Sequence, residues 1–306
     1  MSRMLRLTEA AAVALLLLAV TTASSQEKKQ PAVQKPDPNS IYQLGPDSKK
    51  QPDVPEGKRS DKLTLKSKVY PDTERDYWYY LPPDMDKSKP AKVMVFQDGW
   101  NYCNPKGLAQ LGNVFDNLIH KKEIPPMVGV FVNPGVPLDS DGTRITDRNK
   151  INAQRSLEYD TLSPRYAEFL EKDLLPRIEK DTGIKFSTDP NDRAISGLSS
   201  GGICAFTVAW ERPDLFRKVL SHIGSFTNIK GGHVYPAQIR KSCNPRSRSV
   251  SSCRMAPTIL ITEQATGRWR TRRWLRPSSS ASTIIASSMA RALTRSLMAE
   301  RSCPNR

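Results

Sequence analysis

The sequence has few of the side chains that most often build metal sites, disulfide frameworks and catalytic bases. It contains 3 histidines and 5 cysteines in 306 residues. The cysteines are odd in number and match neither a zinc-binding spacing nor a paired framework, so we assign no disulfide, no metal and no cofactor. The long apolar run at residues 10–20 is shorter than the roughly 20 residues that a membrane-spanning helix needs.

Acidic side chains are scarce toward the C-terminus, and no aspartate follows Asp214. The formal net charge is +16, and most of it lies in residues 241–306, where twelve arginines and one lysine stand against two glutamates. The first 240 residues hold 34 basic and 29 acidic side chains, a net charge of +5. A mildly basic body and a tail without a recognisable binding motif argue against nucleic acid as the partner.

The N-terminal segments differ in composition from the body. Residues 1–25 combine Arg3 and Arg6 with an apolar stretch and the small residues 23–25. This pattern predicts a secretory signal peptide, and therefore a secreted or periplasmic protein without a membrane anchor after cleavage. Residues 26–62 are rich in Lys, Pro, Gln and Asp, which predicts a disordered linker, broken at most by a short docked stretch at residues 41–44.

The body, residues 63–241, alternates between strand and helix patterns. Pro176 is expected to kink the last helix before the central Gly-Ser motif, and Gly183 to end that helix. Strands alternating with helices predict a parallel sheet with helices on both faces. The expected strands are residues 63–80, 92–96, 127–132 and 218–223, and the expected helices are residues 108–119 and 163–182.

The segment 197–201 reads GLSSG and matches the pattern G-x-S-x-G. Glycines two residues either side of Ser199 allow the sharp strand-to-helix bend that presents a serine hydroxyl at its tip. Apolar residues before and after the motif supply the strand and the helix that this bend needs. We favour a nucleophilic Ser199 over the alternative, an ordinary glycine-rich turn between a strand and a helix.

With these segments together, the body resembles the putative-esterase branch of the α/β-hydrolase fold, which includes enterochelin esterase-like, esterase D-like and feruloyl esterase-like proteins. The resemblance implies a three-layer α/β sandwich and hydrolysis of a carboxylic ester through an acyl-enzyme on Ser199. It also implies an oxyanion hole built from the N–H of Ser200 and that of Gly99 or Trp100. The matching segments are residues 95–99, 155–160, 173–176, 197–202 and 222–226.

Five further residues are candidates for the substrate side of the site. Arg155 and Glu158 are either pocket-wall residues or a surface ion pair near a helix start, and Asp98 either faces the pocket or holds its own turn. His222 and His233 follow Ser199 too closely to be the expected base, so we assign them to substrate contacts.

The tail, residues 242–306, changes composition abruptly and is rich in Arg and Ser. One interpretation is a native disordered basic tail, and the other, which we favour, is translation in a shifted reading frame. Shifted codons across residues 250–262 permit the string VFLQDGTNDLDN. Those across residues 289–305 permit GEGAH and then NGGAILPE, with the histidine codon spanning Leu293 and Thr294. A frameshift predicts that the last strands of the sheet are missing or disordered, and that the triad acid and base are absent.

Three functions therefore compete. The first is an exported esterase on a small-molecule or carbohydrate-linked ester, inactive or weakly active in the printed chain. The second is a catalytically silent protein of the same fold that binds a ligand. The third is a basic secreted protein that binds acidic surfaces through its tail.

Overall fold

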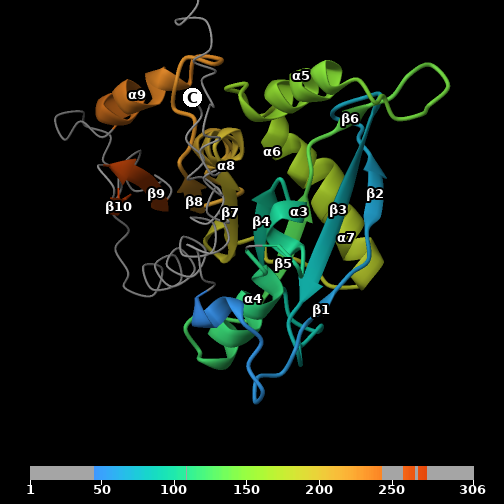
Figure 1. Cartoon of the computed structure of the whole chain (residues 1–306), viewed down its shortest axis with the longest axis vertical. Helices are drawn as coiled ribbons and strands as arrows, with labels where there is room; N and C mark the ends of the chain where they lie inside the picture. The colour runs from blue at the N-terminus through green and yellow to red at the C-terminus, as the bar shows by residue number, and fades with distance from the viewer. Residues whose placement is uncertain (1–44, 108, 243–257, 266–267, 274–306) are drawn as a thin grey trace, which may run out of the picture. The chain divides into compact units, whose positions relative to one another are not determined.

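A computed structural model describes residues 45–107, 109–242, 258–265 and 268–273. Within these residues ten strands form one sheet in the order β1-β3-β5-β4-β7-β8-β9-β10, with β2 and β6 also paired to β3 (Figure 1). The run from β5 to β9 is parallel, which confirms the α/β class and the mostly parallel sheet. The strands are β1 (Lys58–Arg59), β2 (Leu63–Lys66), β3 (Thr73–Leu81), β4 (Lys92–Gln97), β5 (Met127–Val132), β6 (Val136–Pro137), β7 (Arg193–Leu198), β8 (Lys218–His222), β9 (Thr258–Ala265) and β10 (Arg268–Arg273).

The central strands are buried on both faces because they are almost wholly apolar. Every residue of β5 is buried, and so is every residue of β4 after Lys92. In β3 the faces alternate, with Tyr77 packed in the core on one side of the sheet and Trp78 and Tyr80 in the core on the other. This arrangement is typical of parallel strands covered by helices.

The helices lie in two layers, one on each face. Helices α5 to α8 pack with the larger core cluster, and α3 and α4 with the smaller one. A π-helical turn, Leu170–Leu174, separates α6 from α7 and stands just before Pro176, while Gly183 at φ 72° ends α7. No helix within the described ranges is long and apolar enough to cross a membrane. The helices are α3 (Trp100–Cys103), α4 (Leu111–His120), α5 (Arg148–Tyr159), α6 (Arg165–Phe169), α7 (Leu175–Thr182), α8 (Ser200–Glu211) and α9 (Tyr235–Ser242).

The strand expected at residues 63–80 is two antiparallel strands, β2 and β3, joined by a turn. Asp173 fixes the turn, because one of its carboxylate oxygens accepts the Ser67 hydroxyl at 2.6 Å and the N–H groups of Lys68 and Val69 at 2.8 and 3.1 Å. Asp173, whose contacts fix the turn between the two strands, lies about a hundred residues away in the sequence. A pattern in residues 63–80 alone therefore could not predict this turn.

The second half of the expected linker is docked, which corrects the prediction of disorder across residues 26–62. Asn117 of α4 donates to the carbonyls of Asp47 and Lys49 at 2.9 and 2.8 Å, and Gly57 donates to Asp116 at 2.7 Å. Side chains of α4 thus satisfy backbone groups that an isolated polar segment would leave to water. Residues 26–44, including the stretch 41–44, and residues 1–25, which we predicted to be a signal peptide, fall outside the described residues.

The last strands differ from the expectation of a missing or disordered C-terminal edge. Strand β9 lies parallel to β8, with Lys218 opposite Thr258 and His222 opposite Thr262, and β10 pairs antiparallel with β9. The β-branched and apolar run 258–262 has the β propensity that pairing with buried β8 requires. Residues 243–257, 266–267 and 274–306 lie outside the described part of the chain.

Candidate active site

The GLSSG motif forms a sharp turn between β7 and α8. Ser199 has φ 57° and ψ −118°, a conformation that L-residues rarely adopt and that functional sites often retain. A Cβ at Gly197 would overlap the backbone of Gly201, so only glycine permits the tight bend. The bend predicted from the glycine spacing is present, with Ser199 between strand and helix.

The hydroxyl of Ser199 lies 3.1 Å from the hydroxyl of Ser225. The backbone ties the same two segments together, because Ser199 donates its N–H to the carbonyl of His222 and its own carbonyl accepts the N–H of Ser225, at 2.9 and 3.0 Å. The loop after β8 therefore holds the serine from two sides. Ser225 belongs to the segment 222–226 that carried the family resemblance, yet the sequence did not single it out.

Two backbone N–H groups are free for a developing oxyanion at the start of α8. Among the described residues, no hydrogen bond takes up the N–H of Ser200 or of Gly201. These are first-turn N–H groups, which a helix leaves without internal partners and where the helix dipole favours negative charge. The N–H of Ser200, expected as an oxyanion donor, is therefore unengaged in the described part of the chain.

The other two expected oxyanion donors are already engaged. The N–H of Gly99 donates to the Val132 carbonyl at 3.0 Å, and that of Trp100 donates to Asn133 Oδ1 at 3.1 Å. A Cβ on Gly99 would overlap the backbone of β5, so this turn is pressed against the sheet. In this structure neither N–H is therefore available as an oxyanion donor: that of Gly99 bonds to the backbone and that of Trp100 to a side chain.

Two side chains of helix α5, Arg155 and Tyr159, hold the turn after β4 through hydrogen bonds to Asp98. Arg155 binds the Asp98 carboxylate with two hydrogen bonds, Nε to Oδ1 at 3.0 Å and Nη2 to Oδ2 at 2.7 Å, and the Asp98 N–H donates to the Tyr159 hydroxyl at 3.1 Å. Burial opposes the charge on Arg155, but the hydrogen bonds and the charge of Asp98 outweigh it and raise the Arg155 pKa. Asp98, at φ 54°, is a strained residue held by this pair.

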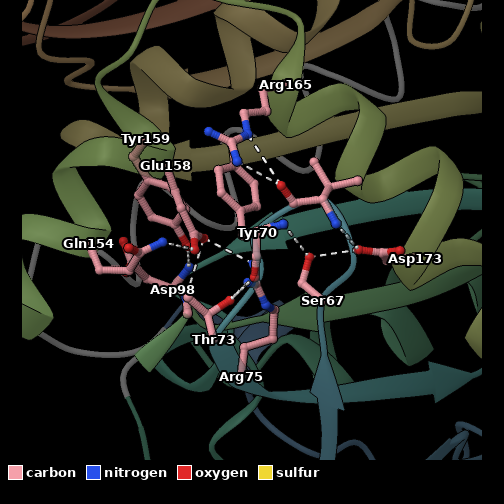
Figure 2. A network of polar contacts seen from close by, with 12 residues as sticks. Ser67, Tyr70, Thr73, Arg75, Asp98, Gln154, Glu158, Tyr159, Arg165 and Asp173 are labelled. Atoms are coloured by element: carbon pink, nitrogen blue, oxygen red, sulfur yellow. Dashed lines mark hydrogen bonds and ion pairs between the residues drawn. The ribbon is translucent and has the colours of Figure 1, made fainter. Parts of the chain in front are cut away.

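Glu158 lies in the core, in a network of polar contacts that includes Gln154 and Arg75 (Figure 2). Its carboxylate accepts from Arg75 at 3.0 Å, Gln154 at 2.8 Å and the Gly135 N–H at 3.2 Å. The surface ion pair considered between Arg155 and Glu158 is therefore not formed. Each residue has a different partner, Asp98 for Arg155 and Arg75 for Glu158, although residues three apart are neighbours on one face of a helix.

The histidines lie in three different environments. His222 is buried at the end of β8, burial lowers its pKa to about 4, and its carbonyl holds Ser199. His233 is exposed in the short helix η4 (Gly232–Val234). His120 ends α4, at the edge of the sheet where β5 begins, opposite the edge that carries Ser199. Among the described residues, the hydrogen-bond partner of the Ser199 hydroxyl is therefore Ser225.

Within the described ranges, no group of three His, Cys, Asp or Glu side chains is placed to hold a metal ion. The two cysteines there, Cys103 and Cys204, are buried and unpaired, and burial raises the pKa of both thiols. Both therefore remain protonated near neutral pH and act as small core residues.

A protein-family model and several solved structures match most of the described residues. A model of the family described as "Putative esterase" matches residues 69–279, and so continues past residue 241, where we placed the end of the domain. The enterobactin esterase of Shigella flexneri is 21% identical, with 65% of this chain and 45% of that chain covered at a TM-score of 0.47. The ferric enterobactin esterase of Salmonella typhimurium is 18% identical, with 84% and 54% covered at 0.46. A ferulic acid esterase is 20% identical, with 66% and 77% covered at 0.45.

This chain thus spans about half the length of the two enterobactin esterases. No curated protein matches the chain.

Proposed function

The chain belongs to the putative esterase family, and we propose that its site hydrolyses a carboxylic ester through an acyl-enzyme on Ser199. The observation that carries this proposal is the strained conformation of Ser199 beside two unengaged N–H groups at the start of α8. A serine hydroxyl so placed can attack a carbonyl carbon while the oxygen that becomes negative lies toward those N–H groups. The alcohol half of the ester leaves, and water later releases the acid.

The attack requires a base that takes the hydroxyl proton from Ser199. Ser225 can orient that hydroxyl, but a serine has no proton affinity to serve as a base near neutral pH. We propose that the acid and the base come from the segment that a corrected reading frame would restore beyond residue 242. The composition of the tail and the permitted strings at residues 250–262 and 289–305 support this. We also propose export, on the composition of residues 1–25.

A fluorophosphonate probe tests the nucleophile. In a chain whose reading frame is corrected near codons 240–245, the probe is expected to label one serine, and peptide mapping should place the label on Ser199. Ser199→Ala should abolish labelling, while Ser196→Ala, at the neighbouring buried strand position, should keep it. Labelling elsewhere, or equal labelling of the Ser199→Ala variant, would contradict the proposal.

Arg155 is a positioning residue in this scheme, because it acts through Asp98 on the turn that precedes Trp100. Arg155→Ala is expected to lower kcat about tenfold with KM nearly unchanged, since small displacements of a catalytic group cost rate steeply. Arg155→Lys should rescue only in part, because lysine cannot make the two-pronged contact. Arg148→Ala, in the first turn of the same helix, is the control. Steady-state kinetics of the frame-corrected chain measure this, and an unchanged kcat in Arg155→Ala would refute the positioning role.

A further inference from the structure

The turn after β8 packs directly on the first turn of α8, backbone against backbone. A Cβ on Gly202 would lie 2.9 Å from the Cα of Gly224, and one on Gly224 would lie 2.5 Å from Ser221 Oγ. Both positions therefore need glycine, because any side chain would push the turn away from the helix. This close approach brings the hydroxyl of Ser225 within 3.1 Å of the hydroxyl of Ser199.

The backbone of this turn is strained at Ile223, which has φ 39°. A β-branched residue rarely adopts this left-handed conformation, and strain of this kind persists where the surroundings impose it, often at a functional site. Here the residues on either side of Ile223 are bonded to Ser199. The His222 carbonyl accepts the Ser199 N–H at 2.9 Å, and the Ser225 N–H donates to the Ser199 carbonyl at 3.0 Å. The strained turn thus has a fixed position relative to Ser199.

Phe226 anchors the other end of the turn in the aromatic part of the core. Its ring meets Phe206 of α8 and Tyr235 of α9 edge to face, with centroids 5.2 and 6.3 Å apart. Ser225 stands between this anchor and the backbone bonds to Ser199, so it has little freedom to move away from the nucleophile. A polar group that is held in place before the reaction costs no reorganisation during it.

The direction of the hydrogen bond between the two hydroxyls follows from the proposed chemistry. Either hydroxyl can donate, and each has one proton and two lone pairs. In the proposed hydrolysis the proton of Ser199 goes to the base. Ser199 Oγ then accepts the hydrogen bond, and Ser225 is its donor.

We propose that Ser225 is a second catalytic hydroxyl, which donates to Ser199 Oγ and stabilises the negative charge on this oxygen while its bond to the acyl carbon forms and breaks. This role rests on the proposed function and goes beyond orienting the nucleophile. During release of the acid, the oxygen of water bonds to the acyl carbon and the base takes the water proton. The bond from that carbon to Ser199 Oγ then breaks, its electron pair stays on Oγ, and the base returns the proton to Oγ. Ser225 keeps its own proton throughout.

Steady-state hydrolysis of p-nitrophenyl acetate by the frame-corrected chain tests this role. Ser225→Ala is expected to lower kcat about tenfold with KM nearly unchanged, the effect of losing one neutral hydrogen bond to the reacting oxygen. The two bonds that tie the turn to Ser199 use main-chain atoms, so the substitution leaves their donors and acceptors in place. Rates are compared at equal folded concentration, measured by circular dichroism.

The matched pair is Ser225→Thr and Ser225→Val, whose side chains have the same shape and differ in the hydroxyl. The threonine variant should keep at least about a third of the parent kcat, while the valine variant should fall to the rate of Ser225→Ala. A purely structural role would affect threonine and valine alike. Thr227→Val, which removes an exposed hydroxyl two residues further along the same loop, should keep the parent kcat.

A Ser225→Ala variant with the parent kcat would overturn the proposal. A higher kcat would overturn it too, because Ser225 would then be the acceptor that withholds the Ser199 proton from the base. If the added methyl group inactivates both the threonine and the valine variants, Ser225→Ala, which adds no atoms, decides. An inactive corrected parent chain contradicts the proposed function and the role of Ser225 together. An active parent matched by Ser225→Ala contradicts the role of Ser225 alone.

Discussion

Replacement of Glu158 by alanine is expected to destabilise the protein by about 3–5 kcal/mol, because it leaves the Arg75 guanidinium charged and unpaired in the core. Both side chains are fully buried, and their N–O distance is 3.0 Å. Arg75 also donates to Thr73 Oγ1 at 2.6 Å, and its guanidinium carbon lies 4.2 Å from the centre of the Phe169 ring. The ring and the hydroxyl alone cannot replace the lost carboxylate.

Urea unfolding followed by far-UV circular dichroism measures this free energy. The control is Glu168→Ala, which removes the exposed pair with Lys172 and should change stability by only about 0.3–0.5 kcal/mol. The double variant Arg75→Met, Glu158→Leu should recover much of the loss, because apolar side chains of similar volume remove the uncompensated charge. A Glu158→Ala variant within about 1 kcal/mol of the parent would show that water reaches Arg75.

Correction of the reading frame near codons 240–245 is expected to raise kcat/KM for a simple aryl ester by about 10⁴-fold or more, the effect of supplying a missing triad base and acid. The printed chain has the sharp bend at Ser199 and the N–H groups of Ser200 and Gly201. It therefore retains only the positioning of the substrate and the electrostatic stabilisation of the developing oxyanion. The sequence strings permitted at residues 250–262 and 289–305 are the proposed source of the acid and the base.

Initial rates of p-nitrophenyl acetate hydrolysis by the printed and the corrected chains, at equal folded concentration, measure the change. In the corrected chain, replacing the histidine encoded across Leu293 and Thr294 should return the rate to that of the printed chain. Equal hydrolysis rates for the two chains, with both folded, would contradict the frameshift hypothesis and favour a native basic tail. Sequencing the gene through codons 240–245 gives an independent answer.

Local sequence was sufficient for the elements whose cause is local. The apolar runs of β4 and β5 predicted buried strands, Gly183 ended α7, and the glycines at 197 and 201 predicted the bend at Ser199. Each of these depends on side-chain size or backbone freedom within a few residues. The family could also be predicted from the sequence, because the segments that carry the resemblance, such as residues 95–99 and 197–202, are short and contiguous.

Partner choice was decided only by tertiary structure. The sequence places Arg155 and Glu158 three residues apart, but the fold pairs one with Asp98 and buries the other against Arg75. It suggested Gly99 as an oxyanion donor, but strand β5 takes up that N–H. Hydrogen bonds and ion pairs between distant segments depend on which strand neighbours which, and sheet order is set by packing over the whole core, not by the residues on either side.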